Sequence, residues 1–201
     1  MDLYDLKKSN NIHIAEIVSI HIGAFPGFFL TDLGKDFLSV FYLALIRDDS
    51  TIFWGIKGDS QFEGFFVASS SPFGLYSRLF KKNIFKFFLP LTFAFFKNIS
   101  LLRRMITSFI SLNAYVVPNE YSAVLLSICV SPSSSGKGIG KILLAKLERE
   151  LALKGHKGYY LTTDKNDNQA TNHFYISYGF QLHYVFKQGT REMNVYKKYL
   201  E

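Results

Sequence analysis

Hydrophobic and polar positions follow the clearest pattern in the second half of the chain. Residues 124–130 are a short apolar run of strand length, rich in β-forming residues. After a polar loop, apolar side chains recur every four positions at Ile139, Leu143, Leu147 and Leu151, which predicts an amphipathic helix. Gly155 follows and suits the left-handed conformation that ends many helices.

Residues 159–163 predict a second strand, and Asp167 or Asn168 can cap a second helix that ends at Gly179. A strand, a helix and a second strand in this order predict two parallel neighbours joined by a right-handed crossover. The first half of the chain is expected to form a strand at 3–7, a helix that follows Asn10 or Asn11 and runs to about 24, and a second helix that ends at about 46. Two hairpins are also expected, one from strands at 51–56 and 62–70 and a closing one from strands at 182–187 and 192–199.

The loop between the first of these strands and its helix carries the candidate chemistry. Gly136, Gly138 and Gly140 alternate with other residues, so backbone amides can approach a ligand and point at it. The start of a helix favours an anion, and Lys137 and Lys141 add positive charge. A diphosphate is the expected ligand, the alternative being that the glycines only let the helix pack closely on its strand. A P-loop is excluded because Gly140-Lys141 is not followed by Ser or Thr.

Residues 130–144 resemble the acyl-CoA-binding loop of the GCN5-related N-acetyltransferase (GNAT) superfamily. Residues 168–180, in which an Asn precedes a Phe-Tyr pair and a Gly-Phe pair, resemble its second motif. The resemblance implies an α/β (α+β) fold with a central mixed, mostly antiparallel sheet, a parallel pair of strands splayed at the CoA site and helices on both faces. It also implies a single N-acyltransferase domain over residues 1–201. The superfamily usually has Arg or Gln at the position of Ser135, so one diphosphate contact is expected to be missing or supplied by Lys137.

The same resemblance implies which residues hold and use acyl-CoA, with no metal. Tyr175 is similar to the tyrosine that protonates the departing thiolate, the alternative being that it only packs in an aromatic pair. The strand before the loop lacks the carboxylate that many relatives use as general base. Asp164 and His21 are left as candidates to take the amine proton or to orient the amine. The implied cofactor-binding residues are Ile128, Val130, Gly136, Lys137, Gly138, Ile139, Gly140, Lys141, Asn168, Asn172 and Phe174.

Residues 71–121 are a helical insertion relative to the minimal fold that the resemblance implies. The apolar run at 84–96 is shorter than the roughly 20 residues of a membrane span, and Lys86 and Pro90 interrupt it. We favour a lid or wall of the acceptor pocket over a membrane-surface or dimer contact. Residues 64–119 hold Lys and Arg but no Asp or Glu, and account for the whole net charge of +7. This indicates an anionic partner or a solvated basic face.

The missing carboxylate favours an acceptor amine that is largely neutral at pH 7, such as an amino sugar. Residues 25–34, 161–164 and 191–196 resemble GNAT members that acylate nucleotide-linked amino sugars for bacterial surface polysaccharides. We therefore expect transfer of an acetyl or short hydroxyacyl group from acyl-CoA to such a sugar. The candidate acceptor-binding residues are Phe25, Phe28, Thr31, Arg78 and Lys81.

Other functions stay open from the sequence. They are N-acetylation of a protein or peptide amine or of an aminoglycoside-like molecule, and a basic membrane-surface or nucleic-acid-binding module on a CoA-binding fold. We expect no nucleic acid partner, because the basic residues do not alternate with exposed aromatic ones. Cys129 is the single cysteine and is interpreted as a small core residue, which fits a reducing compartment. The N-terminus lacks a signal-peptide pattern, so a cytoplasmic protein is expected. A monomer or a homodimer is expected as its oligomeric state.

Overall fold

The structure, a computed structural model, describes residues 1–8, 13–97 and 123–200. Its elements are β1 (Asp2–Asp5), α1 (Ile14–Ala24), α2 (Phe29–Asp32), α3 (Lys35–Arg47), β2 (Thr51–Lys57), β3 (Phe62–Ser69), α4 (Leu75–Lys97), β4 (Ala123–Val130), the 3-10 turn η1 (Pro132–Ser134), α6 (Ile139–Leu153), β5 (Gly158–Asp164), α7 (Gln169–Ser177), β6 (Gln181–Gln188) and β7 (Arg191–Tyr199). Asn10 and Asn11, one of which was expected to precede the first helix, lie outside the described residues, and α1 begins at Ile14. A further short helix, α2, lies between the two helices that were expected to end at residues 24 and 46.

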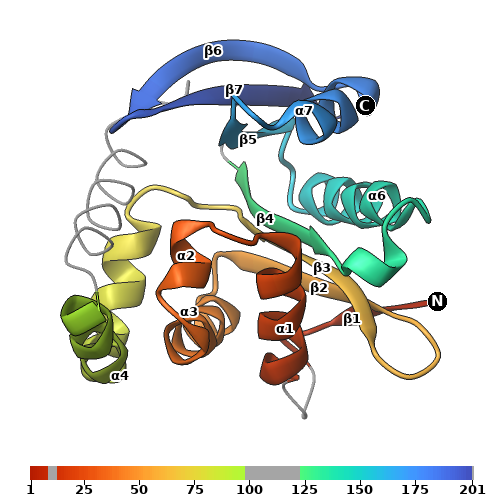
Figure 1. The fold of residues 1–201 in the computed structure, drawn as a ribbon. Coiled ribbons are helices and arrows are strands. Elements are labelled where there is room, and N and C mark those ends of the chain that lie inside the picture. The colour runs from red at the N-terminus through yellow and green to blue at the C-terminus, as the bar shows by residue number, and fades with distance from the viewer. Residues whose placement is uncertain (9–12, 98–122, 201) are drawn as a thin grey trace.

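The strands form one seven-stranded sheet in the order β1-β2-β3-β4-β5-β7-β6. β4 and β5 are parallel, and every other neighbouring pair is antiparallel. In Figure 1, α1 to α4 lie on one side of the sheet and α6 and α7 lie on the other. The predicted mixed, mostly antiparallel sheet with one parallel pair is therefore confirmed.

The parallel pair separates early. β4 pairs with β5 only through Ala123, Val124 and Leu125, although both strands continue beyond that point. The pairing of β4 with β3 also shifts register here, so that Leu126 has no partner between the pairs Ala68–Leu125 and Val67–Ser127. A bulge of this kind bends its strand and redirects nearby groups. The result is an edge of β4, from residue 126 onward, that faces no strand in the described structure.

Aromatic side chains fill the core between the sheet and the N-terminal helices. The rings of Tyr42, Phe53 and Phe65 lie 5.4–5.8 Å apart between their centroids, and all three side chains are fully buried. Phe87 of α4 is buried against Phe37 of α3, with centroids 5.5 Å apart. The start of the insertion is therefore part of the core. On the other face, the predicted stripe of α6 is buried as expected.

The described part of the insertion is α4, and residues 98–121 lie outside the described residues. α4 bends at Asn83, whose φ of −127° and ψ of 20° are not helical. The Asn83 side-chain amide donates to the Leu79 carbonyl at 2.9 Å, so a side chain takes part of the backbone bonding at the bend. Tyr76, in the first turn of α4, lines a cavity beside β4. Part of the insertion therefore forms one wall of this cavity.

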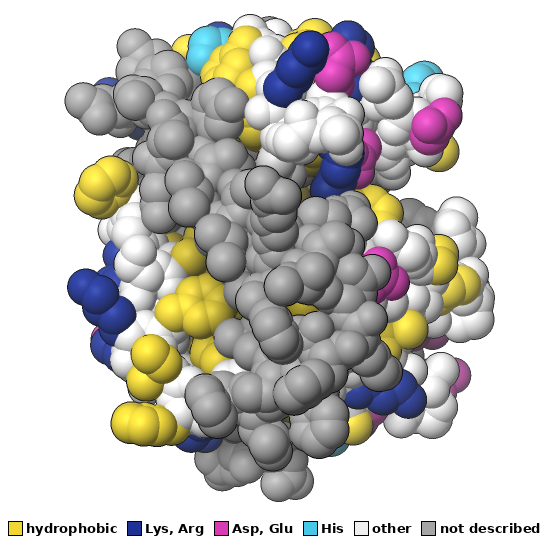
Figure 2. Space-filling view, turned by 60° about the vertical axis from the view of Figure 1, so that its left-hand side comes forward, with side chains coloured by type: hydrophobic (Ala, Val, Ile, Leu, Met, Phe, Trp, Pro, Cys, Tyr) yellow, Lys and Arg dark blue, Asp and Glu magenta, His cyan; other side chains and the backbone are white. Residues whose placement is uncertain are grey.

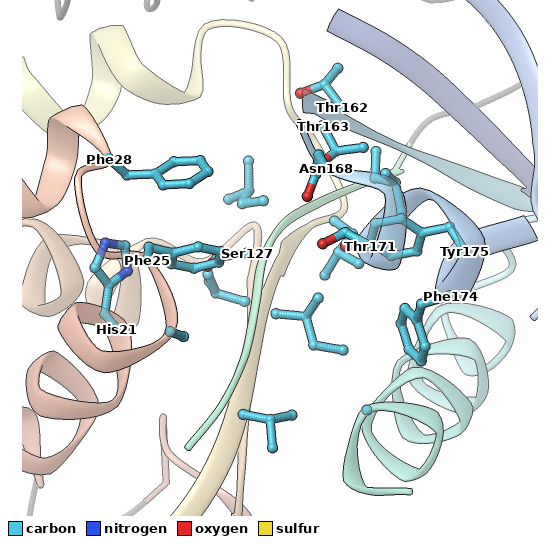
Figure 3. Close-up of a pocket in the computed structure, with 18 of the residues that line it drawn as sticks. His21, Phe25, Phe28, Ser127, Thr162, Thr163, Asn168, Thr171, Phe174 and Tyr175 are labelled. Carbon is cyan, nitrogen blue, oxygen red and sulfur yellow. The ribbon is translucent and has the colours of Figure 1, made fainter. Parts of the chain in front are cut away.

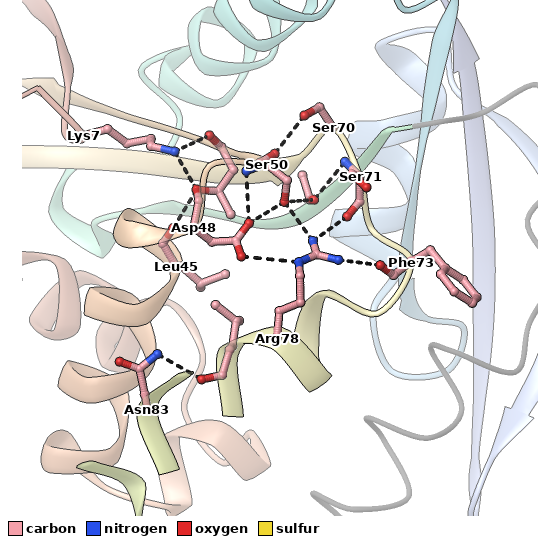
Figure 4. Close-up of polar contacts among 12 residues, drawn as sticks. Lys7, Leu45, Asp48, Ser50, Ser70, Ser71, Phe73, Arg78 and Asn83 are labelled. Carbon is pink, nitrogen blue, oxygen red and sulfur yellow. Dashed lines mark hydrogen bonds and ion pairs between the residues drawn. The ribbon is translucent and has the colours of Figure 1, made fainter. Parts of the chain in front are cut away.

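Arg78 was proposed as an acceptor-binding residue, and the structure gives it another role (Figure 4). Its guanidinium donates to the carbonyls of Phe73 and Ser71 at 2.6 and 2.9 Å and to Ser50 Oγ at 3.1 Å. Its Nε lies 3.5 Å from the carboxylate of Asp48, a side chain only 4% exposed. Neither Arg78 nor Lys81 lines the cavity. Arg78 ties α4 to the loop before β2, because its donors are used within the protein.

The surface of this region combines apolar and basic side chains. Phe73, Ile84 and Phe85 are largely exposed, and Lys81 and Lys82 lie near them in the chain. Figure 2 shows hydrophobic and basic side chains beside one another along the left edge of the molecule. Among the described residues, no helix has both the length and the apolar character that crossing a membrane requires. A membrane-surface contact stays a prediction.

We expect Arg78→Ala to destabilise the fold without changing acceptor affinity. The substitution removes three hydrogen bonds and leaves the buried Asp48 carboxylate short of a partner, which costs roughly 1–3 kcal/mol of unfolding free energy. Thermal unfolding should show a Tm lowered by several degrees. Lys81→Ala is the matched control, since it removes one positive charge from the same helix at an exposed position. Equal Tm values for the two variants would contradict the structural role of Arg78.

Candidate active site

A cavity of about 710 Å³ runs along the open edge of β4. Its size is in the range of small-molecule sites, about 300–1,000 Å³. Figure 3 shows His21, Phe25 and Phe28 on one wall, Thr162, Asn168 and Tyr175 on the opposite wall, and Ser127 on the strand between them. The cavity therefore joins the two halves of the chain at the point where β4 and β5 separate.

The glycine loop closes one end of this cavity. Gly136 and Gly138 both have φ of +78°, a conformation that side chains disfavour, and a Cβ added to either would meet nothing within 4 Å. Gly138 is the N-cap of α6, so the free amides of the first turn lie beside it. Both observations fit a loop that cradles an anionic group. Gly140 differs, because a Cβ there would lie 3.0 Å from the Phe174 ring, and close packing of α6 and α7 requires this glycine.

Most of the predicted cofactor residues line the cavity, and two do not. The lining includes Ile128, Val130, Gly136, Gly138, Ile139, Gly140, Lys141, Asn168 and Phe174. Lys137 is absent from the lining, and its ammonium donates to Ser134 Oγ at 3.3 Å. That Lys137 replaces the diphosphate contact expected to be missing at Ser135 stays a prediction. Lys141 is the lysine of this loop that lines the cavity.

Asn172 is a structural residue in this fold. Its amide donates to the carbonyls of Asp164 and Asn168 at 3.0 and 2.9 Å, and its carbonyl oxygen accepts from Asn194 and Tyr196 at 2.9 and 3.0 Å. The structure places its side chain away from the cavity because these bonds connect α7, β5 and β7. Asn168 lines the cavity and donates to Thr163 Oγ1 at 2.8 Å. It is the N-cap of α7 but makes no side-chain cap bond.

Tyr175 reaches the cavity from α7. Its side chain is 7% exposed, and its ring packs against Phe180 and Tyr196 as well as lining the cavity. Burial raises the pKa of the Tyr175 phenol well above its usual value of 10. The hydroxyl is therefore neutral at pH 7 and able to donate a proton or a hydrogen bond. Both the packing interpretation and the catalytic interpretation of this residue fit its position.

Asp164 is held in an ion pair at the rim. Arg191 donates from Nε to Asp164 Oδ1 at 2.7 Å and from Nη2 to Asp164 Oδ2. The guanidinium carbon of Arg191 also lies 5.7 Å from the centre of the Phe28 ring, and both residues line the cavity. Both carboxylate oxygens are occupied, which disfavours the predicted use of Asp164 as a general base. Sequence reasoning did not single out Arg191, because the pairing of residues 27 positions apart depends on the hairpin geometry.

His21, the other candidate to take the amine proton or to orient the amine, is buried, with 3% of its surface exposed. Its Nδ1 lies 2.6 Å from the Tyr42 hydroxyl, and its Nε2 is buried without a hydrogen-bond partner among the described residues. Burial lowers the pKa of His21 to about 4, so the imidazole is neutral at pH 7. His21 lines the cavity together with Phe25 and Phe28. Thr31 does not, and its hydroxyl donates to the Phe25 carbonyl at 2.8 Å.

Cys129 is a buried core residue, as the sequence predicted. Burial raises the pKa of its thiol to about 12, so it is a poor nucleophile at neutral pH. Within residues 1–8, 13–97 and 123–200, no three His, Cys, Asp or Glu side chains gather as metal ligands. Ser127, Tyr42, Phe41 and Tyr76 also line the cavity, and sequence patterns did not distinguish them from ordinary core positions.

Comparison with known families and structures identifies this arrangement. Residues 106–180 match the acetyltransferase (GNAT) family. The fold is that of the GNAT acetyltransferases. An aminoglycoside 6′-N-acetyltransferase solved with coenzyme A has a TM-score of 0.65 at 13% identity, with 100% of this chain and 98% of that chain covered. A GNAT-family protein of Desulfovibrio desulfuricans scores 0.64 at 14% identity, with 100% and 99% covered.

The ribosomal-protein-S18-alanine N-acetyltransferase of Escherichia coli has a TM-score of 0.55 at 14% identity, with 99% of this chain and 93% of that chain covered. At these identities the solved structures establish the GNAT fold and not a shared substrate. No curated protein matches the sequence significantly. The family match over residues 106–180 supports a GNAT-type N-acetyltransferase, and the solved structures support its fold.

We expect Gly138→Asp to weaken coenzyme A binding at least about tenfold, which is roughly 1.4 kcal/mol. The new carboxylate would repel a diphosphate, and its Cβ would occupy the open space in the loop. Calorimetric titration with coenzyme A measures this loss. Gly155→Asp is the matched control, because Gly155 has the same left-handed φ, +79°, and equally open space at the other end of α6. Equal affinities for the two variants would remove the loop from the site.

Proposed function

We propose that the chain is an acyl-CoA-dependent N-acyltransferase that moves an acetyl or short hydroxyacyl group directly to an amine. The supporting observation is that one cavity connects the glycine loop, the open edge of β4 and the Tyr175 side chain. Bound acyl-CoA would supply the thioester from which the acyl group is transferred. Gly136, Gly138 and the first turn of α6 would hold its diphosphate, with Lys141 nearby.

The open edge of β4 fits the arm of the cofactor. Residues 126–130 face no strand on the side of β5, so their backbone groups can bond to an extended amide-containing chain as a strand would. A backbone amide near the bulge at Leu126 is suited to stabilise the oxygen of the thioester carbonyl as negative charge develops. Ile128 and Val130 line this part of the cavity.

The transfer forms a C–N bond between the acceptor amine and the acyl carbon, and it breaks the C–S bond of the thioester. The departing sulfur takes a proton from the Tyr175 hydroxyl, which is neutral because it is buried. The amine nitrogen loses one proton, which passes to solvent, and Tyr175 regains one from solvent. Only a neutral amine has the lone pair for attack. Asp164, the one described carboxylate that lines the cavity, is paired with Arg191.

A nucleotide-linked amino sugar is the acceptor that the sequence resemblance supports. The support from charge is weaker than the sequence suggested, because Arg78 bonds within the protein and Lys81 lies away from the cavity. The structural neighbours include enzymes named for aminoglycosides and for a ribosomal protein. Thiol release from acetyl-CoA should therefore be measured with a UDP-linked 4-amino sugar, an aminoglycoside and an alanine-terminated peptide. No thiol release above the hydrolysis rate with any amine would contradict the proposed activity.

We expect Tyr175→Phe to bind coenzyme A normally and to lose turnover by about 10²–10⁴-fold, because only the proton donor is removed. Steady-state thiol release and calorimetry separate the two effects. Tyr160→Phe is the matched control, since Tyr160 is equally buried but does not line the cavity. If both variants turn over within twofold of the wild type, another group or water provides the proton.

A further inference from the structure

The Nε2 atom of His21 is a buried polar atom without a partner among the described residues. Buried polar groups are almost always hydrogen-bonded, and leaving one unpaired costs about 1–3 kcal/mol. The other ring nitrogen is already used, because Nδ1 lies 2.6 Å from the Tyr42 hydroxyl. That bond and the edge-on contacts with Phe25 and Tyr42 hold the ring in place. Since His21 lines the cavity, a ligand is the natural partner for Nε2.

The part of the cavity around His21 is lined mainly by apolar side chains. We call it the apolar chamber, and it comprises Phe25, Phe28, Phe41, Leu45 and Tyr76 with smaller apolar neighbours. Phe41 and Tyr76 stack with an interplanar angle of 7°. Of the described Lys and Arg side chains, Lys141 and Arg191 line the cavity. Lys141 belongs to the glycine loop, and Arg191 is paired with Asp164. The apolar chamber therefore offers no free cation to an anionic acceptor within the described structure.

We propose that His21 Nε2 accepts a hydrogen bond from the acceptor amine, and that this amine is a primary amine carried on an apolar, aromatic or aliphatic body. The proposal rests on the proposed N-acyltransferase function. His21 donates its Nδ1 proton to the Tyr42 oxygen, and Nε2 then presents a lone pair to the cavity. The imidazole stays neutral, and an apolar chamber disfavours a charged ammonium. His21 thus selects and orients the neutral amine that the transfer needs.

Tyr42 fixes the orientation of the His21 ring from the buried side. Its ring is fully buried, and its hydroxyl lies beside the side chains of Ser127 and Cys129, to which it can donate while it accepts from His21. Ser127 Oγ and Cys129 Sγ are themselves 3.3 Å apart. Donation from Tyr42 to one of these side chains on β4 would leave the Nδ1 proton on His21 and its Nε2 lone pair facing the cavity. Tyr42 is a positioning residue in this arrangement.

The test compares His21→Asn with His21→Gln, using acetyl-CoA and phenethylamine as the probe acceptor. The Asn side chain reaches only the place of Nδ1 and keeps the Tyr42 bond, whereas Gln reaches the place of Nε2 with a hydrogen-bonding amide. We expect His21→Asn to raise the KM for phenethylamine at least about tenfold, with the KM for acetyl-CoA unchanged. His21→Gln should stay within about threefold of the wild type. Thermal unfolding of both variants identifies a folding defect.

The possible outcomes distinguish a failure of the role proposed for His21 from a failure of the proposed N-acyltransferase function. Equal acceptor KM values for the two variants and the wild type would overturn the role of His21. If the wild type acylates the UDP-linked amino sugar but not phenethylamine, the apolar acceptor class is wrong and the N-acyltransferase function stands. If neither phenethylamine nor the UDP-linked amino sugar, the aminoglycoside or the peptide is acylated, the proposed function is wrong, and so is this inference, which rests on it. If only His21→Asn fails to fold, the test rests on His21→Gln. An acceptor KM of that variant more than about threefold above the wild type would then overturn the role of His21.

Discussion

Three residue pairs join β4 to β5, and beyond Leu125 and Leu161 the two strands separate. The sheet keeps its continuity because β4 stays paired with β3 and β5 stays paired with β7 over their lengths. The separation therefore costs backbone hydrogen bonds only along the two edges that face each other. Those edges, and the cavity between them, are the place where an extended ligand can replace a missing strand. The candidate site residues that line the cavity are arranged around this gap.

The gap is kept open by large, rigid side chains on one side and by helix packing on the other. Phe37, Phe41 and Tyr42 of α3 are buried against the sheet, and the Arg78 network holds α4 against the loop that precedes β2. On the opposite side, Phe174 packs over Gly140 and fixes α7 on α6. Phe25, Phe28, Phe41 and Phe174 line the cavity, so part of the high phenylalanine content of the sequence, 21 residues, forms its walls.

Local patterns in the sequence predicted the elements and the glycine loop that lines one end of the cavity. The four-residue spacing from Ile139 to Leu151 and the alternating glycines are properties of neighbouring residues in the sequence, so they can be recognised without knowledge of the fold. The acceptor half depends on side chains from distant segments. Whether Arg78 faces a ligand or Asp48, and whether Asp164 is free or paired with Arg191, is decided by tertiary contacts between residues about 30 positions apart. Charge counting could not distinguish these cases, because a lysine or arginine carries the same charge in either role.

The two ends of the cavity differ in a way that suits the chemistry of acyl transfer. The loop end offers backbone amides and Lys141 to an anion, and the other end offers apolar rings and a neutral imidazole. A diphosphate is therefore drawn to one end, while a charged ammonium gains little at the other. Because both oxygens of Asp164 are bound by Arg191, no described carboxylate in the cavity is free to stabilise that ammonium. The arrangement favours an amine that enters without its extra proton, which removes the need for the strong general base that the strand before the loop lacks.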